Sequence, residues 1–149
     1  KRPYVKNKII IENIIKKICS RYLIIRLPEI VGKNKNPHTL TNFFYDNIIK
    51  GKSFTIFKNS RRNLLDIDDA IKNSIKLIKA NKENKKIMNL LNKKFYTPLQ
   101  IVKNFETILQ KKAIYTFKIN KVNKFNLKNN YFVQSKKDYL LKILKKNYI

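Results

Sequence analysis

The sequence predicts an α/β fold built on a parallel sheet. Segments with apolar residues at helical spacing alternate along the chain with short apolar runs that are typical of strands. The clearest of these runs, residues 22–25, is apolar throughout, as expected for a strand covered on both faces. With 149 residues, 43% of them hydrophobic, the chain is long enough to bury the core of one domain.

The first third of the chain reads as helix, strand, loop and helix. Pro3 suits the first turn of a helix whose apolar face repeats at Ile11, Ile14, Ile15 and Ile18. The strand at 22–25 follows, and Pro28, Gly32 and Pro37 then predict a loop. Thr39 is a good N-cap for a second helix that ends before Gly51 and has one apolar side, formed by Leu40, Phe43, Phe44 and Ile48.

The rest of the chain continues the alternation. We expect strands at 54–57, 86–90 and 113–119, a turn at 59–60, and an irregular loop over 120–134. Asp66 or Asp68 would cap a third helix, and Thr97 followed by Pro98 opens a fourth. Residues 135–138 resemble a capping box for a last helix. The apolar residues on these three helices are Ile67, Ile71, Ile75 and Ile78, then Ile101, Val102, Phe105 and Ile108, then Tyr139, Leu140, Ile143 and Leu144.

The formal charge of +26 raises the possibility of a nucleic-acid-binding module. Lysine, however, makes up most of the 35 basic residues. Proteins that recognise nucleic-acid bases and phosphates favour arginine, whose planar guanidinium forms two hydrogen bonds at once. The lysines are spread over every segment beside many Ile and Asn residues, a composition that A/T-rich codons would also produce. One His and one Cys are too few for a zinc site, and Cys19 cannot form an intramolecular disulfide. We therefore expect no metal site and a cytoplasmic protein.

Tyr4 and Lys8 stand four residues apart on the first predicted helix, so their side chains share a face. A free tyrosine is a weak acid, with an ordinary pKa of about 10. An ammonium group one helical turn away favours the phenolate, which suits a phenol to proton transfer with a substrate hydroxyl. The pair is a candidate catalytic acid/base, although this spacing alone is not specific in a lysine-rich chain.

Two further motifs follow in order. The first runs from Arg26 to Gly32, directly after the buried strand, and the second is Arg62-Asn63-Leu64-Leu65-Asp66-Ile67-Asp68-Asp69. With the Tyr-x-x-x-Lys pair, this series resembles the second half of the extended short-chain dehydrogenase/reductase family, the NAD(P)-dependent nucleotide-sugar epimerases, dehydratases and reductases. The resemblance covers residues 3 to 110, and it implies the last strands of a Rossmann-type sheet plus a small α/β substrate-binding lobe.

The resemblance also implies roles for single residues. Tyr4 and Lys8 would be catalytic and would contact the NAD or NADP cofactor, as would Pro28 and Ile30. Glu29, Asn36, Thr39 and Arg62 would bind a nucleotide-diphosphate sugar, with Arg62 on the diphosphate and Arg61 as a possible second contact. Glu29 departs from the Asn or Ser that is common in the family. Asp66, Asp68 and Asp69 more simply cap a helix, and His38 is expected in a loop near the substrate or exposed.

Some of the family's parts are not in this sequence. It holds only two glycines, Gly32 and Gly51, so there is no glycine-rich cofactor loop, and the Ser or Thr that precedes the catalytic Tyr is also absent. We expect the first half of the Rossmann sheet to lie upstream and the isolated chain to be inactive. Residues 1–35 would end the cofactor-binding domain, and residues 36–149 would form mostly the substrate lobe, with some segments returning to the sheet.

Several alternatives stay open from sequence. The isoleucine face of the first helix could pack in a homodimer or on the sheet. The chain could be a non-catalytic remnant of the enzyme, or a basic nucleic-acid-binding module. The sequence does not separate epimerase from dehydratase or reductase, and it does not separate NAD from NADP.

Overall fold

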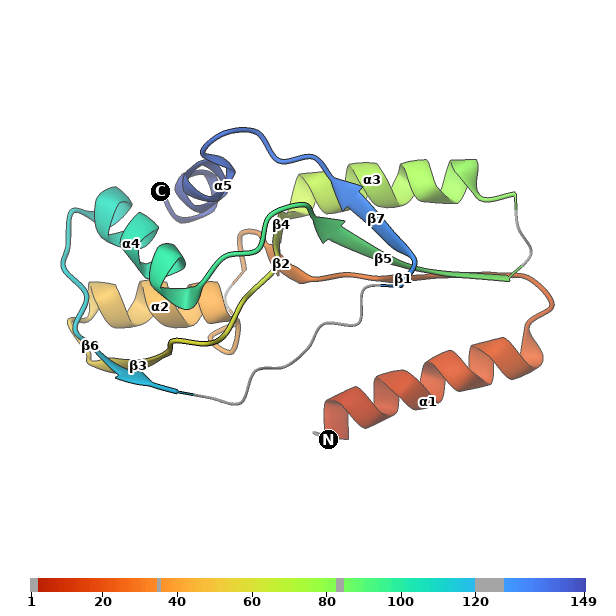
Figure 1. Cartoon of the computed structure of the whole chain (residues 1–149), viewed down its shortest axis with the longest axis horizontal. Helices are drawn as coiled ribbons and strands as arrows, with labels where there is room; N and C mark the ends of the chain where they lie inside the picture. The colour runs from red at the N-terminus through yellow and green to blue at the C-terminus, as the bar shows by residue number, and fades with distance from the viewer. Residues whose placement is uncertain (1–2, 35, 83–84, 120–127) are drawn as a thin grey trace.

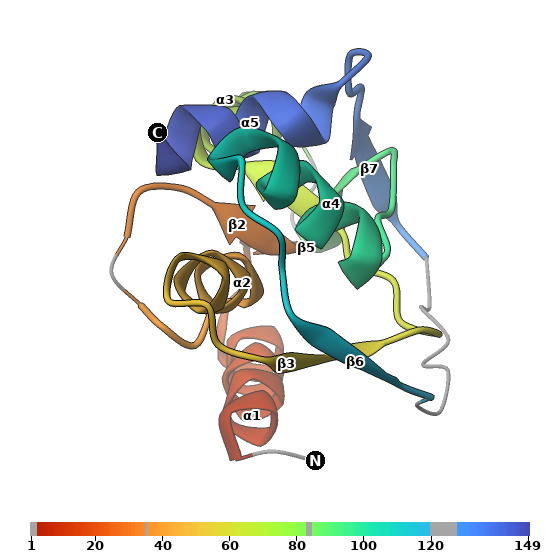
Figure 2. The ribbon, with the colours of Figure 1, turned by 90° about the vertical axis from the view of Figure 1, so that its left-hand side faces the viewer.

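The computed structural model describes residues 3–34, 36–82, 85–119 and 128–149. Within these residues the strands pair in three parallel sheets. The largest has the order β1 (Tyr22–Arg26), β5 (Lys85–Asn92) and β7 (Asn130–Val133). Its register places Tyr22 opposite Lys85 and Asn89 opposite Asn130. Helices α1 (Pro3–Ile18) and α3 (Ile67–Ala80) lie on opposite sides of this sheet (Figures 1 and 2).

The strand β7 corrects the prediction of an irregular loop over 120–134. Residues 130–133 extend the sheet beside β5, whereas residues 120–127 lie outside the described part of the chain. A strand of four residues with no clear alternation carries little periodic signal, and its pairing is decided by contacts with a distant segment.

A second correction concerns the segment after β1, which was expected to be a loop. Glu29–Val31 form the short strand β2, paired in parallel with β4 (Leu64–Asp66), so that Glu29 lies opposite Leu64 and Val31 opposite Asp66. This pair joins the three-stranded sheet to the rest of the molecule. The two motifs that follow β1 and precede α3 therefore run side by side.

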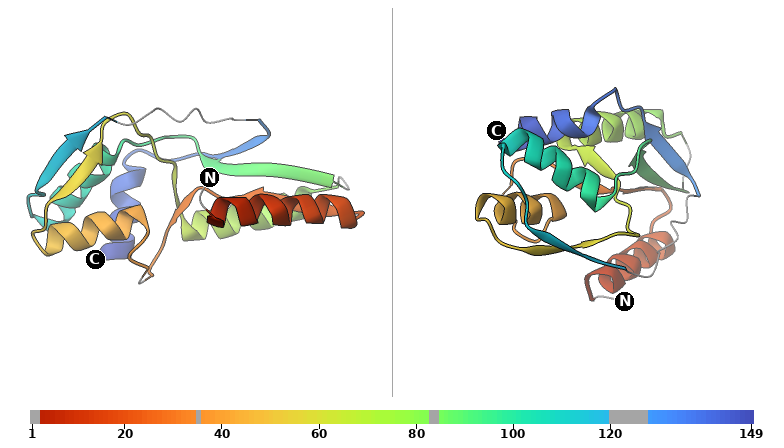
Figure 3. Two further views of the ribbon diagram at one scale, coloured as in Figure 1. Left: turned by 90° about the horizontal axis from the view of Figure 1, so that it is seen from below. Right: turned by 60° about the vertical axis from the view of Figure 1, so that its left-hand side comes forward.

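The remaining elements form a lobe at one end of an elongated molecule, with the three-stranded sheet, α1 and α3 at the other end (Figure 3). The lobe contains α2 (Leu40–Ile49), α4 (Pro98–Leu109), α5 (Tyr139–Tyr148) and the parallel pair of β3 (Phe54–Phe57) and β6 (Tyr115–Lys118). Each of these elements was predicted from the sequence, and β6 is shorter than the expected strand at 113–119.

Two hydrophobic clusters meet at β4. Leu64 belongs to the cluster of the lobe and Leu65 to the cluster under the three-stranded sheet, and both are fully buried. Successive residues of a strand point to opposite faces, so β4 contributes to both cores at once. The main buried residues of the lobe are Phe44, Ile48, Ile56, Ile101, Val102, Phe105 and Leu144.

The predicted helix starts are confirmed except for the last. The side chains of Thr39, Asp66 and Thr97 each accept a backbone N–H of the first turn, and Thr97 forms a complete capping box with Gln100. The expected capping box at residues 135–138 is absent: Asp138 precedes α5 with φ 59° and no side-chain cap bond.

The isoleucines of α1 and α3 are mostly exposed. On α3 the buried residues are Ala70, Asn73 and Leu77, whereas Ile67, Ile71, Ile75 and Ile78 face outward. On α1 no residue is buried, and Ile11, Ile14 and Ile18 are exposed. The described elements of this chain therefore leave two apolar helix faces uncovered.

The described residues contain neither a membrane-spanning helix nor a group of metal-ligating side chains. None of their helices combines the length and the apolar character that crossing a membrane requires. They also contain no cluster of three or more His, Cys, Asp or Glu side chains that could hold a metal ion.

Candidate functional site

Neighbouring side chains of strand β2 line two different pockets. Glu29 lines a pocket beside the start of α2, whereas Ile30 lines a second pocket beside the start of α3. This follows from the alternation of side chains along a strand. The loop after β2 packs closely on α3, since a Cβ added at Gly32 would lie 3.2 Å from the Cβ of Ile67. A larger residue at this position would push β2 away from α3.

The start of α2 carries two capping oxygens. The Thr39 hydroxyl accepts the backbone N–H of Asn42, and the Glu29 carboxylate accepts the backbone N–H of Leu40 at 2.8 Å. The first N–H groups of a helix have no partner within the helix and carry a partial positive charge. Glu29 therefore supplies a negative charge from β2, eleven positions earlier in the chain, to the point where α2 favours one.

The electrostatics of Glu29 combine opposing effects. Burial raises the pKa of this carboxyl above its usual range, while the N–H groups of Leu40 and Thr41 and the charge of Arg62 act to lower it. Burial is the largest of these effects. The carboxyl is accordingly easier to protonate than an exposed glutamate.

Arg62 faces the same pocket from the other side. Its backbone forms an antiparallel bridge with Tyr96, with two N–H···O bonds of 2.8 Å that fix the segment just before β4. The pocket has a volume of about 510 Å³ and is lined by Glu29, Pro37, His38, Thr39, Leu40, Phe43 and Arg62. It thus contains three of the four predicted substrate-binding residues, an apolar wall and an arginine fork suited to phosphate.

Asn36, the fourth predicted substrate residue, does not line this pocket. Its backbone carbonyl accepts the Asn42 side-chain amide at 2.8 Å, and its own side chain accepts the His38 N–H at 3.0 Å. These bonds shape the loop that carries His38 and Thr39. In the structure Asn36 supports the pocket rather than facing it.

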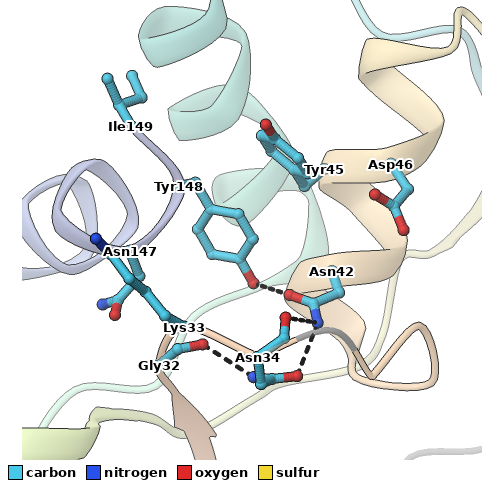
Figure 4. Close-up of a pocket in the computed structure, with 9 residues that line it drawn as sticks. All are labelled: Gly32, Lys33, Asn34, Asn42, Tyr45, Asp46, Asn147, Tyr148 and Ile149. Atoms are coloured by element: carbon cyan, nitrogen blue, oxygen red, sulfur yellow. Dashed lines mark hydrogen bonds between the residues drawn. The ribbon is translucent and has the colours of Figure 1, made fainter.

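A second cavity of about 630 Å³ lies behind this loop, between α2 and the end of α5 (Figure 4). The buried Asn42 side chain donates to Asn34 and accepts a bond from the Tyr148 hydroxyl. Burial raises the pKa of Tyr148 to about 12, and the charge of Glu29 contributes to the rise. Tyr148 therefore remains a neutral donor near neutral pH and holds α5 to α2.

The three aspartates at the start of α3 have structural partners. Lys146 of α5 contacts Asp66 at 2.7 Å and Asp68 at 2.6 Å. The Tyr139 hydroxyl accepts the Asp66 N–H and donates to Asp69, and burial raises the pKa of Tyr139. As predicted, Asp66 caps the helix, and this group of residues also ties α5 to α3.

Tyr4 and Lys8 lie together on α1, with the Lys8 ammonium 5.5 Å from the centroid of the Tyr4 ring. Tyr4 is 71% exposed, and neither residue lines the pocket that contains Arg62. A bidentate ion pair, with N···O distances of 2.8 and 2.6 Å, joins α1 to the end of β1 through Glu12 and Arg26. Pro28 is half-buried in the short segment between β1 and β2. The structure therefore brings three of the four predicted substrate residues together and leaves the Tyr/Lys pair on a separate, accessible surface.

The comparisons with known proteins identify the family and the fold of the chain. A family model described as the NAD dependent epimerase/dehydratase family matches residues 1–90, more than half of the chain. The chain belongs to the NAD-dependent epimerase/dehydratase family. Comparison with curated proteins found no match.

Solved structures of nucleotide-sugar epimerases and dehydratases have the same fold. A UDP-glucuronic acid 4-epimerase from Bacillus cereus in complex with NAD is 21% identical, with a TM-score of 0.67 over 85% of this chain and 43% of its own. A dTDP-glucose 4,6-dehydratase from Bacillus anthracis in complex with NAD is 16% identical, with a TM-score of 0.66 over 99% and 53%.

A third match, a UDP-glucose 4-epimerase from Thermotoga maritima with UDP-glucose, is 15% identical, with a TM-score of 0.63 over 97% and 51%. The chain thus spans about half of the length of these proteins. The predicted fold class, a partial Rossmann-type sheet with a small α/β lobe, is confirmed.

Sequence reasoning missed the residues that complete the site. Leu40 and Phe43 were placed on the apolar side of α2, yet they form a wall of the pocket. Tyr148 received no role, although it bonds to Asn42 behind the same loop. The partners of Tyr148 lie more than a hundred residues away in the chain, and no local pattern predicts such a contact.

Proposed function

We propose that this chain is the substrate-binding part of an NAD- or NADP-dependent enzyme that modifies a nucleotide-diphosphate sugar by epimerisation, dehydration or reduction. The observation that carries the proposal is the pocket at the start of α2, where Arg62, Thr39 and the N-terminal backbone amides converge. Helix N-termini and arginine forks are both suited to phosphate oxygens. Solved proteins of the same fold are complexed with UDP-glucose or UDP-glucuronic acid.

Each side of the pocket would have its own task. Arg62 would bind the diphosphate, Thr39 and the first amides of α2 would orient it, and Phe43 would give the ligand an apolar contact. The apolar wall excludes water on one side, which strengthens the attraction between Arg62 and the phosphates. Arg61, the neighbouring cation, could add a second contact.

The proton-transfer step is assigned to Tyr4 and Lys8. The Tyr4 hydroxyl would take the proton from a sugar hydroxyl or return it, while the Lys8 ammonium would bind the ribose of the cofactor. NAD or NADP, contacted by Tyr4, Lys8, Pro28 and Ile30, would supply the hydride-transfer chemistry when bound. Both side chains extend from one face of α1, and Tyr4 is largely exposed, so the pair is accessible from solvent.

The residues present fit only part of a dinucleotide. Pro28, Ile30, Tyr4 and Lys8 would contact its nicotinamide end, but the chain has no glycine-rich loop for the pyrophosphate. In a preparation that also contains a dinucleotide-binding half, Tyr4→Phe should lower turnover by roughly 10²–10⁴-fold, the usual contribution of an acid/base group. Substrate affinity should change little, and an unaltered turnover would contradict the assignment.

Binding of UDP-glucose to the 149-residue chain tests the substrate site directly, for example by isothermal titration calorimetry. Arg62→Ala should weaken binding by about 10–100-fold, because a hydrogen bond to a charged group is worth about 1.5–3 kcal/mol. Arg21→Ala is a matched control, since Arg21 is an exposed arginine in the turn before β1. Equal affinities for the two variants would contradict the proposed diphosphate contact.

A further inference from the structure

Among the described residues that line the pocket, Glu29 is the one carboxylate. The Glu29 side chain accepts the Leu40 N–H at 2.8 Å, so it already occupies part of the space where the start of α2 attracts an anion. Glu29 and Arg62 also attract each other: the positive charge of Arg62 opposes the rise in the pKa of Glu29 that burial causes. A carboxylate is therefore held where a phosphate would be attracted.

We propose that Glu29 is a built-in competitor for the phosphate groups of the ligand, and that it must be protonated or displaced before a diphosphate can reach the first amides of α2 and Arg62. This inference rests on the proposed function, because it concerns the same pocket. It makes Glu29 a specificity-determining residue. The pocket would bind an anion more tightly when Glu29 is neutral, and an ionised Glu29 would disfavour a ligand that brings two negative charges.

The physical argument is the cost of bringing like charges together. Two like charges held a few ångströms apart in a partly buried site repel each other strongly, and solvent at the open side of the pocket reduces this repulsion. Replacing the carboxylate by an amide removes the repulsion. The glutamine oxygen could still accept the Leu40 N–H, so the cap of α2 would be kept.

The pH dependence has a definite sign. Burial raises the pKa of Glu29, so the carboxyl takes up its proton at a higher pH than an exposed glutamate would. Affinity for an anion should therefore rise as the pH falls through the acidic range. The groups that face Glu29 are the Leu40 and Thr41 amides, Arg62 and Tyr148, and His38 lines the same pocket.

Among these groups His38 needs a control. Its imidazole lines the same pocket and could contribute to anion binding, so the comparison is repeated in a His38→Gln background. Tyr148 stays neutral over the range of the experiment, because its pKa is raised to about 12.

The test is a titration of the full chain with UDP between pH 5.5 and 8, using calorimetry. At pH 7.5, Glu29→Gln should bind UDP about tenfold more tightly than the wild type, a change of about 1.4 kcal/mol. The affinity of Glu29→Gln should depend less on pH. Uridine, which has no phosphate, should bind both proteins equally.

Glu106→Gln is the matched control variant. Glu106 also caps a backbone amide, the Ala113 N–H at 2.9 Å, and also lies beside a cation, Lys103 at 2.7 Å. It lines a different pocket, so its change to glutamine should leave UDP binding as in the wild type. Circular dichroism checks that each variant is folded.

The outcomes separate the two proposals. Equal UDP affinities for the wild type and Glu29→Gln, with Arg62→Ala weaker than both, would overturn the role of Glu29 and leave the diphosphate site intact. If no protein binds UDP at any pH tested, both this inference and the proposed substrate site are overturned. Tighter binding that extends equally to uridine would also overturn the inference, since it would not depend on phosphate.

Discussion

Asn63 and Asn92 hold β4 against the end of β5. The Asn63 amide donates to the Asn92 carbonyl, and the Asn63 side-chain oxygen accepts the Asn92 N–H, both at 2.8 Å. The Asn92 side chain in turn donates to the Leu64 carbonyl at 3.0 Å and accepts the Lys94 N–H at 2.9 Å. Both side chains are buried, so these bonds form without competition from water.

Asn92→Ala should destabilise the fold by about 2–4 kcal/mol, because the substitution removes two hydrogen bonds and leaves the buried Leu64 carbonyl without this partner. Urea unfolding followed by circular dichroism measures the change. Asn104→Ala is the control, since the Asn104 side chain bonds to the Gln100 carbonyl on the exposed side of α4. Similar unfolding midpoints for the two variants would contradict the role given to Asn92.

At the residue scale, sequence reasoning succeeded where a side chain acts on its own neighbourhood. Thr39 and Thr97 cap helices that begin one residue later, and this information is local. Glu29 and Asn92 act on partners 11 and 28–29 positions away, so their contacts depend on strand pairing that no local pattern reveals. The grouping of Glu29, Thr39 and Arg62 came from the family resemblance rather than from spacing.

Two helices end in the left-handed conformation with different residues. Gly51 follows α2 with φ +62°, and Gln110 ends α4 with φ 51°. Glycine adopts this conformation without strain, whereas other residues meet a clash between Cβ and the backbone. The two positions therefore predict opposite responses to substitution.

Gly51→Ala should destabilise the protein by about 1 kcal/mol, the usual cost of a Cβ in the left-handed region. Apart from the neighbouring residues, no atom lies within 4 Å of the added Cβ, so a steric clash with other parts of the fold does not add to the backbone strain. Gln110→Gly should instead stabilise by about 0.5 kcal/mol, since the gain in the folded state is partly offset by a more flexible unfolded chain. Thermal unfolding monitors both variants, and shifts in the same direction would contradict the argument.

At the element scale, long segments with strong periodicity were predicted well and short strands were not. Helices α2, α4 and α5 show apolar residues at helical spacing, and those residues are largely buried in the lobe. Strands β2 and β7 have three and four residues and gain their identity only from parallel partners elsewhere in the chain. Helix α3 was also predicted, although its isoleucines point outward and a smaller set of residues forms its buried side.

The molecule as a whole exposes large apolar side chains at the end away from the lobe. Ile11, Ile14 and Ile18 on α1 are 51%, 49% and 72% exposed, and Ile71 and Ile75 on α3 are 53% and 46% exposed. Apolar helix faces of this kind normally pack against other protein. Packing of a second copy on α1 stays a prediction. The exposed faces flank the three-stranded sheet, and in Figure 1 α1 lies well apart from the lobe.

The division of the molecule also predicts how its two kinds of ligand should behave. The proposed diphosphate pocket is formed by α2, β2 and the segment before β4, all within this chain. The expected cofactor contacts are limited to the nicotinamide end, and no glycine-rich loop is available to approach a pyrophosphate closely. The isolated chain should therefore keep substrate affinity and lack cofactor affinity.

We expect the 149-residue chain to bind NAD⁺ or NADP⁺ no more tightly than about 1 mM, which corresponds to only about 4 kcal/mol of binding free energy. Saturation-transfer NMR with each dinucleotide, run beside UDP-glucose on the same sample, makes the comparison. Lys8→Ala should leave the weak dinucleotide signal nearly unchanged, because one exposed ammonium contributes little without the rest of the cleft. Micromolar binding of either dinucleotide would show that this chain alone forms a cofactor site, and the proposed division of tasks would then be wrong.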